Sequence, residues 1–185
     1  MSQNNPWKTH SSREIYENAW IQVREDAVTR PDGKPGIYGV VSMKNRAVGV
    51  VPLHADGTVT LVGQFRYTLD EYSWEIPEGG CAPEESLFEA ARRELLEETG
   101  LIAGKIEPLG GEIHLSNSVT DERGQLFLAT ELTQGEAAPE GTEKIETRRV
   151  SLEKAVEMAL RGEINDSLSV LGLLLARTET SESKR

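Results

Sequence analysis

Hydrophobic and polar residues alternate along the first part of the chain, which is the pattern of half-buried strands. The alternation runs over residues 15–41 and is interrupted at residues 30–36, RPDGKPG, a composition that favours a turn. We therefore expect a long β-hairpin over residues 15–41. Residues 1–12 and the last eight residues are polar, and we expect both ends to be frayed.

Two valine-rich segments follow the hairpin, at residues 47–54 and 58–66. The dipeptide Asp56-Gly57 lies between them and is typical of a tight turn, so they predict a second pair of strands. Further elements are expected as strands near residues 103–114 and 125–131 and as helices near residues 151–161 and 165–177.

The segment at residues 84–98 has helical periodicity. Pro83 suits the first turn of this helix, and Gly100 suits the position just beyond its end. Because helices alternate with strands along the rest of the chain, we expect a layered domain of the α/β or α+β class.

The composition of the chain argues against disulfide-rich, membrane-spanning and nucleic-acid-binding proteins. The chain has 185 residues, a single cysteine and a formal net charge of -11. One cysteine excludes an internal disulfide framework, and the apolar runs fall short of the roughly 20 residues that a membrane-spanning helix needs. We expect a soluble, cytoplasmic protein that associates with neither membrane nor nucleic acid, since a nucleic-acid groove needs a basic stripe.

The acidic residues are concentrated in two stretches. Residues 84–98 hold six glutamates and two arginines, and residues 131–146 hold five glutamates and one lysine. Such runs are usually solvated faces, so their spacing must decide whether they form a site.

Three glutamates of the first stretch lie on the wrong face for solvation. Projected at about 100° per residue, Glu94, Glu97 and Glu98 lie on the side that carries Leu87 and Ala91. The carboxylates of Glu94 and Glu98 repel each other across one helical turn. Glu97 and Glu98 also lie in the last turn, where the helix dipole disfavours negative charge.

The electrostatic cost of placing three glutamates on this face indicates that a cation neutralises them. Arg92 and Arg93 project away from the three glutamates, so we expect them to contribute little neutralisation. Hard oxygen ligands in this arrangement suit Mg²⁺ or Mn²⁺ better than zinc, which prefers Cys and His.

Nine positions over residues 79–101 form one spaced motif: Gly79, Glu85, Arg93-Glu94-Leu95, Glu97-Glu98 and Gly100-Leu101. This pattern resembles the complete Nudix box, G-x5-E-x7-R-E-U-x-E-E-x-G-U, in which U is aliphatic. The resemblance implies a Nudix-type α/β/α sandwich with a mixed sheet, and an enzyme that hydrolyses nucleoside diphosphates linked to another group with the help of a divalent metal.

The resemblance also implies roles for the box residues. Glu94, Glu97 and Glu98 would be metal ligands, Glu85 would lie near the metal, and Gly79 would offer its backbone carbonyl. Arg93 would anchor the geometry of the loop and the helix. A bound metal would neutralise the pyrophosphate and lower the pKa of an attacking water.

The segments at residues 64–80 and 16–34 resemble ADP-ribose and nucleoside diphosphate sugar pyrophosphatases. In those relatives an N-terminal hairpin swaps across a homodimer, which implies a dimerisation element at residues 1–44 and a Nudix domain at residues 45–185. The substrate contacts would fall at Trp20, Arg66 and Glu75, through base stacking and bidentate binding of the diphosphate. Trp20 and Trp74 could equally be dimer or core aromatics.

The chain departs from the commonest ADP-ribose pattern at two places. It has EGG at residues 78–80 where many relatives have AGG, and SNSVTDE at residues 116–122 where they often carry a glycine-rich loop. A broader nucleoside diphosphate sugar hydrolase is therefore an alternative, with Asp121 and Glu122 as candidate contacts to the terminal sugar.

The second acidic stretch is where this subfamily places a loop-borne general base. Glu143 fits best because it comes two residues before Ile145, where a strand is expected to begin. Glu140 and Glu146 compete for the role, and Glu97 is the first candidate if the base belongs to the box.

Two other functions stay open at this point. Nudix-fold modules can sense sugar nucleotides without cutting them, although such modules typically lose box glutamates. Other Nudix enzymes act on nucleoside triphosphates or dinucleoside polyphosphates.

Overall fold

The computed structural model describes residues 4–135 and 144–182. The chain divides into two compact units, each described by itself below. The first unit comprises Met1–Asn45 and His114–Arg123, and the second comprises Arg46–Ile113 and Gly124–Arg185. The division into domains at residues 44 and 45 stays a prediction.

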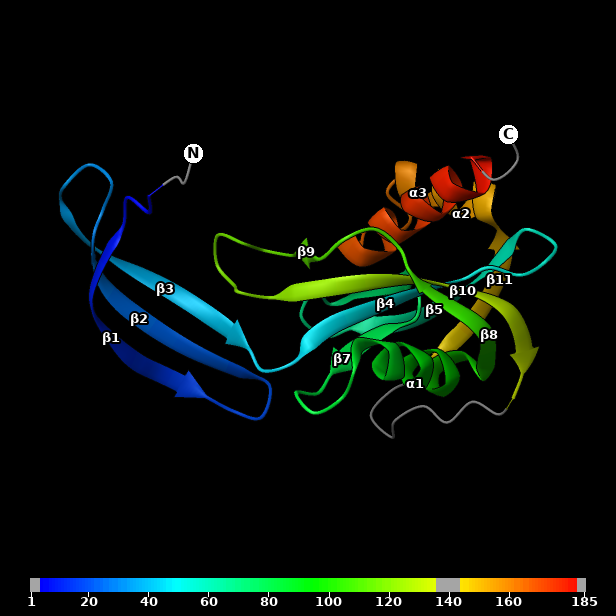
Figure 1. The fold of residues 1–185 in the computed structure, drawn as a ribbon, viewed down its shortest axis with the longest axis horizontal. Helices are drawn as coiled ribbons and strands as arrows, with labels where there is room; N and C mark the ends of the chain where they lie inside the picture. The colour runs from blue at the N-terminus through cyan, green and yellow to red at the C-terminus, as the bar shows by residue number, and fades with distance from the viewer. Residues whose placement is uncertain (1–3, 136–143, 183–185) are drawn as a thin grey trace. The chain divides into compact units, whose positions relative to one another are not determined.

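The first unit is built on a three-stranded antiparallel sheet in the order β1-β2-β3, drawn in blue in Figure 1. Its strands are β1 (Lys8–Glu17), β2 (Ile21–Thr29) and β3 (Pro35–Met43). The expected turn at residues 30–36 does separate two strands, but β1 adds a third, with Lys8 opposite Thr29. The expectation of fraying was wrong for residues 8–12, which belong to β1. This strand is exposed along its whole length and is held by backbone pairing, which hydrophobic periodicity does not reveal.

Residues 114–123 join this first unit through β3. The backbone N–H of Val41 donates to the carbonyl of Val119 (2.9 Å), and the N–H of Met43 donates to Oδ1 of Asp121 (3.0 Å). The hydroxyl of Tyr38 donates to the carbonyl of Ser118 (2.8 Å). A segment far away in sequence thus completes the unit.

Within the residues that the structure describes, the second unit contains two sheets and three helices. One sheet is mixed and has the order β7-β4-β10-β8, with β9 paired to β10; the other is antiparallel with the order β11-β5-β6. The strands are β4 (Arg46–Pro52), β5 (Thr58–Arg66), β6 (Glu71–Glu75), β7 (Glu78–Cys81), β8 (Leu101–Pro108), β9 (Ile113–His114), β10 (Arg123–Gln134) and β11 (Glu146–Ser151). The helices are α1 (Leu87–Thr99), α2 (Leu152–Leu160) and α3 (Ser167–Glu182).

The expected pairing of the two valine-rich strands was wrong. Both strands exist, but β4 pairs in parallel with β10 and β5 pairs with β6 and β11, so they belong to different sheets. Near their turn the two segments are joined by one isolated antiparallel bridge, between Leu53 and Val59. Both strands are buried on both faces, and such strands carry no alternation that could indicate their partners.

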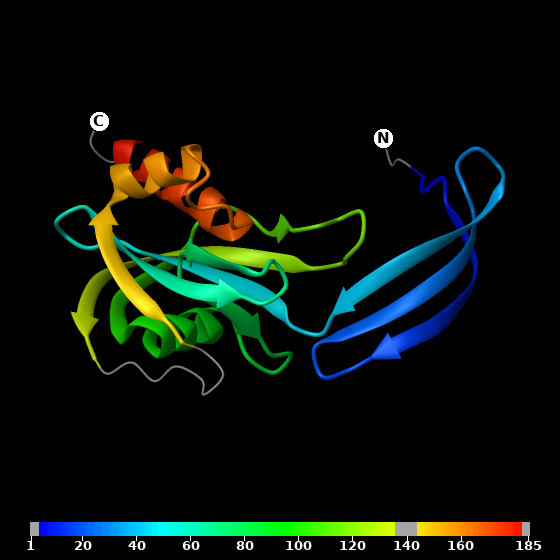
Figure 2. The same ribbon diagram turned by 180° about the vertical axis from the view of Figure 1, so that it is seen from behind.

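The strands of the second unit lie between α1 on one side and α2 and α3 on the other (Figures 1 and 2). The expected layered α/β arrangement is therefore confirmed. None of the helices within the described part of the chain is long and apolar enough to cross a membrane.

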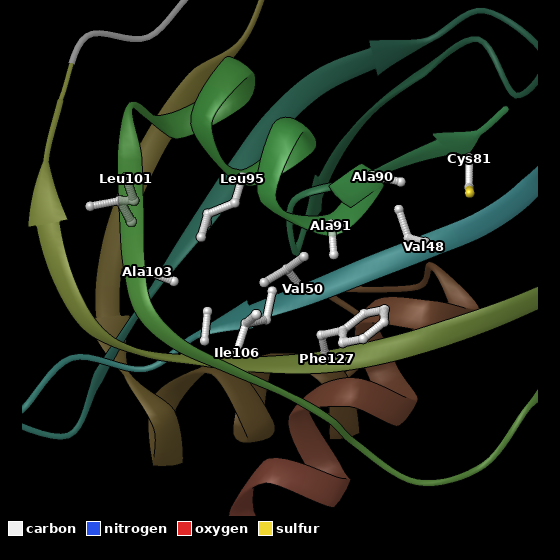
Figure 3. Packing of buried hydrophobic residues seen from close by; sticks show 11 residues of the cluster. Val48, Val50, Cys81, Ala90, Ala91, Leu95, Leu101, Ala103, Ile106 and Phe127 are labelled. Atoms are coloured by element: carbon white, nitrogen blue, oxygen red, sulfur yellow. The ribbon is translucent and has the colours of Figure 1, made fainter. Parts of the chain in front are cut away.

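The main core fills the space between α1 and the mixed sheet. Ala91 and Leu95 point from the helix toward Val50, Ile106 and Phe127 on the strands (Figure 3). All five side chains are at most 8% exposed. Because this packing uses one stripe of α1, it fixes which way the remaining faces of the helix point.

Candidate active site

The helix α1 starts and ends at defined residues. Ser86 is the N-cap: its hydroxyl accepts from the N–H of Glu89 (3.2 Å), and the Glu89 carboxylate accepts from the N–H of Ser86 (3.0 Å), which is a capping box. Pro83 lies in the turn ahead of the helix rather than in its first turn, because the cap places the start at Leu87. At the other end Gly100 adopts φ 71°, as expected for the residue that ends this helix.

Arg93 gathers the carboxylates of the box. Its guanidinium donates to both oxygens of Glu85 (3.0 and 2.9 Å), to Glu94 (2.7 Å) and to Glu97 (3.1 Å), and also to the carbonyl of Gly80 (2.8 Å). The expectation that Arg93 would contribute little neutralisation was wrong. A helical projection gives the direction of Cβ only, whereas a guanidinium on a long stem reaches several neighbours.

These contacts shift the pKa values of Glu85 and Arg93. Hydrogen bonding to Arg93, opposed by burial, lowers the pKa of Glu85. The hydrogen bonds to Glu85, followed by those to Glu94 and Glu97, raise the pKa of Arg93 in spite of its partial burial. Glu85 and Arg93 therefore keep their charges at neutral pH.

Strand β7 helps to position Glu98 and Glu94 of α1. Glu98 is only 4% exposed, and it accepts the backbone N–H of Glu78 (3.0 Å). The Glu94 carboxylate lies so close to Gly79 that a Cβ at residue 79 would overlap it. Only glycine permits this approach of strand and carboxylate.

The five predicted metal-site residues and the predicted anchor Arg93 thus lie together at the junction of β7 and α1: Gly79, Glu85, Glu94, Glu97 and Glu98 surround Arg93. Within residues 4–135 and 144–182, no three His, Cys, Asp or Glu side chains stand in metal-binding geometry. In this structure Arg93 is the cation that Glu94 and Glu97 share.

A second arginine cluster lies on the hairpin of β5 and β6. Arg66 donates through Nε to both oxygens of Glu75 (2.9 and 3.1 Å) and through Nη2 to Oε2 of Glu75 and to Oε1 of Glu78 (2.8 Å). Burial opposes the charge of Arg66, but these two carboxylates outweigh it and raise its pKa. The predicted residues Arg66 and Glu75 are therefore partners of each other.

Glu78 connects the two clusters and was not among the predicted site residues. Its side chain binds Arg66 while its backbone N–H binds Glu98. Burial, and then the nearby charge of Asp166, raises the pKa of Glu78 well above its usual range. The only sequence signal was the departure from AGG to EGG at residues 78–80.

Asp166 and Ser169 at the start of α3 were also missed. Asp166 accepts the N–H of Ser169 (2.7 Å), and the Ser169 hydroxyl accepts the N–H of Ile76 (2.9 Å). These bonds tie the β6–β7 connection to a helix more than 80 residues later in the sequence. No local pattern indicates such a contact.

The other predicted residues are distributed as follows. Trp20 (69% exposed), Asp121 and Glu122 belong to the first unit, where Asp121 binds the backbone of Met43. Glu146 begins β11 and accepts from the hydroxyl of Tyr72 (3.2 Å). Glu140 and Glu143 lie outside the described residues.

Comparison with known proteins agrees with this geometry. Residues 43–169 match the NUDIX domain, and residues 7–41 match the nucleoside diphosphate sugar hydrolase N-terminal domain. The chain is 32% identical over 162 residues to an ADP-ribose pyrophosphatase of Bacillus subtilis, with 86% of each protein covered. It is 30% identical over 180 residues to an ADP-ribose pyrophosphatase of Mycobacterium tuberculosis, which covers 95% of this chain and 85% of that relative.

A crystal structure of an ADP compounds hydrolase has the same fold, with a TM-score of 0.87 over the whole of both chains at 20% identity. Nudix hydrolases generally need a divalent metal ion. The spaced box and the loop-helix geometry around Arg93 agree with the match over residues 43–169. On these grounds the chain belongs to the Nudix family of hydrolases.

Proposed function

We propose that the protein hydrolyses the pyrophosphate bond of ADP-ribose or a related nucleoside diphosphate sugar and releases a nucleoside monophosphate and a sugar phosphate. The observation that carries the proposal is the carboxylate cluster of α1 around Arg93. The support for the substrate class comes from two relatives named as ADP-ribose pyrophosphatases, which match 86% and 95% of the chain.

The residues at the junction of β7 and α1 fit a divalent cation. Their donors are carboxylate oxygens and a backbone carbonyl, which Mg²⁺ and Mn²⁺ prefer. The carboxylate of Glu94 lies directly against the backbone of Gly79, whose residue supplies the carbonyl donor. We propose that Glu94, Glu97, Glu98 and the carbonyl of Gly79 hold Mg²⁺ or Mn²⁺, with Glu85 nearby.

A bound cation would supply charge neutralisation and an acidified water. The chain's own part is to hold the ligands in place. Arg93 ties Glu85 to the Gly80 carbonyl, which keeps the loop against the helix, and the N–H of Glu78 orients the buried carboxylate of Glu98. Positioning of this kind costs no reorganisation during the reaction.

Arg66 is the proposed contact to the diphosphate. Glu75 and Glu78 saturate its Nε and Nη2, so within the described residues Nη1 is the edge left for a ligand. About one third of the side chain is exposed, at 34%. Trp20, Asp121, Glu122 and Glu75 stay proposed substrate contacts, and Glu97 a proposed catalytic group.

The substrate class is tested by comparing ADP-ribose, ADP-glucose, GDP-mannose and dGTP at saturating Mg²⁺. We expect kcat/KM for the best nucleoside diphosphate sugar to exceed that for dGTP by at least about tenfold, or about 1.4 kcal/mol of transition-state binding. Products are identified as nucleoside monophosphate and sugar phosphate by chromatography. Preferred cleavage of dGTP would contradict the substrate class, and binding without any turnover would favour a sensing module.

Replacing a proposed metal ligand should abolish activity without unfolding the protein. Glu98→Gln keeps the acceptor for the Glu78 N–H but removes one ligand charge, so kcat should fall by about 10² or more. Mn²⁺ binding, followed by electron paramagnetic resonance, should weaken in parallel. The melting temperature without metal should stay level or rise, because the repulsion between residues 94 and 98 is relieved.

The matched control for this variant is Glu84→Gln, which removes the same charge from an exposed position two residues ahead of the helix N-cap. It should leave both turnover and Mn²⁺ binding unchanged. Full turnover of Glu98→Gln at saturating Mg²⁺ would rule out the metal assignment.

We further propose Glu143 as the general base that takes a proton from water. Glu143→Gln should then lower kcat about 10²–10⁴-fold with little change in KM or metal affinity. Glu140→Gln and Glu146→Gln serve as matched controls and should behave like wild type. A large loss in Glu140→Gln instead would move the role to that residue, and near-normal turnover in all three would move it to Glu97.

We also propose that the protein is a homodimer through its N-terminal sheet. Ile15, Trp20 and Ile37 are 51%, 69% and 71% exposed there, which is apolar surface that a second copy would cover. Sedimentation equilibrium at micromolar concentration should give twice the chain mass of 20.4 kDa. A single 20.4 kDa species would disprove the dimer.

A further inference from the structure

A cavity of about 680 Å³ lies in the second unit, where the parallel strands β4 and β10 end. This volume is within the range of small-molecule sites, about 300–1,000 Å³. None of its lining residues belongs to the box or to the cluster around Arg66. The residues used in the argument are Leu53, His54, Asp56, Glu131, Leu132, Leu152 and Glu153.

One lining residue is held in a strained backbone conformation. Glu131 has φ 55° in the middle of β10, a region that L-residues other than Asn, Asp and Gly rarely adopt. Asp70 also has a positive φ, but it lies in the turn between β5 and β6, where this conformation is ordinary.

The neighbouring strand makes room for this conformation. The ladder between β10 and β8 keeps one register on both sides of Glu131, with Thr130 opposite Lys105 and Leu132 opposite Ala103, so Glu131 lies opposite Gly104. A Cβ on Gly104 would lie 2.9 Å from Cβ and Oε2 of Glu131. Strained residues of this kind are concentrated at functional sites.

The cavity carries excess negative charge. Asp56 is neutralised by two hydrogen bonds from Arg149, each 2.9 Å long. Glu153 forms no ion pair with the described residues, and Lys105, on which the charge of Glu131 acts, is bound to Glu107 at 2.7 Å. Glu131 therefore shares Lys105 with Glu107, and Glu153 has no ion-pair partner among the residues that the structure describes.

The remaining wall is neutral or apolar. Burial, and then the charge of Arg149, lowers the pKa of His54, so its ring is uncharged at neutral pH. Its Nε2 is hydrogen-bonded to the hydroxyl of Thr60 (2.8 Å). Leu53, Leu132 and Leu152 supply an apolar surface between the charged groups.

We propose that this cavity binds a small organic cation that carries an amine on an apolar body. The ammonium group would lie between the carboxylates of Glu131 and Glu153, and the body would pack on the three leucines. This site is separate from the proposed hydrolysis, so its test does not depend on the substrate of the enzyme.

Three probes of matched shape test the proposal: 3-phenylpropylamine, 3-phenylpropanol and 3-phenylpropanoate. Backbone amide shifts are followed by NMR on the full chain. We expect the amine to bind at least about tenfold more tightly than the alcohol, with the carboxylate weakest, and to shift Leu53, Thr130 and Leu132. Equal binding of amine and alcohol, shifts located on α1 instead, or no binding by any probe would overturn the proposal.

Two variants separate the charge of Glu131 from its strain. Glu131→Gln keeps the strained backbone and removes the charge, so the affinity for the amine should fall to that for the alcohol at an unchanged melting temperature. Glu131→Gly removes both the charge and the backbone strain, because glycine adopts a positive φ readily. Its affinity for the amine should fall to that for the alcohol, and its melting temperature should not decrease.

Glu163→Gln is the matched control, since it removes the same charge from an exposed residue that does not line the cavity. It should leave the affinity for the amine unchanged. Tight amine binding that persists in both variants of Glu131 would show that this residue has only a structural role and would overturn the site.

Discussion

The active-site region depends on one guanidinium group. Arg93 binds Glu85, Glu94 and Glu97 together with the carbonyl of Gly80, and so it joins the loop after β7 to the helix that follows. Without a cation the carboxylates of α1 would repel one another on a half-buried face, where an unpaired charge is strongly unfavourable. Arginine suits this place because its planar group offers five donors and stays charged.

A second arginine is bound by carboxylates in a similar way. Arg66 is held between Glu75 and Glu78, and Glu78 also donates its N–H to Glu98. Glu78 of β7 therefore connects the two arginine clusters. We expect a substitution at Arg66 to displace Glu78 and, through its N–H, the proposed metal ligand Glu98. A chain with a net charge of -11 can keep many carboxylates in one region because each of these arginines is shared among several of them.

Local patterns predicted a good part of this arrangement. The helix of the box, its end at Gly100, and the turn at residues 30–36 are confirmed, because capping, turn geometry and periodicity act over a few residues. Prediction was wrong for Arg93 and for the pairing of the valine-rich strands. A projection ignores how far a side chain reaches, and a strand buried on both faces carries no signal for its neighbour.

The sequence by itself determined which donors exist and how they are spaced, since an i,i+4 pair or a capping box is a property of adjacent turns. It also determined the family, through nine positions over 23 residues. Only the tertiary structure decided that β4 lies parallel to β10, that Asp166 acts on Glu78, and that Glu131 lines a cavity with His54. Such contacts join residues many positions apart, and they follow from competition among all possible packings rather than from any local preference.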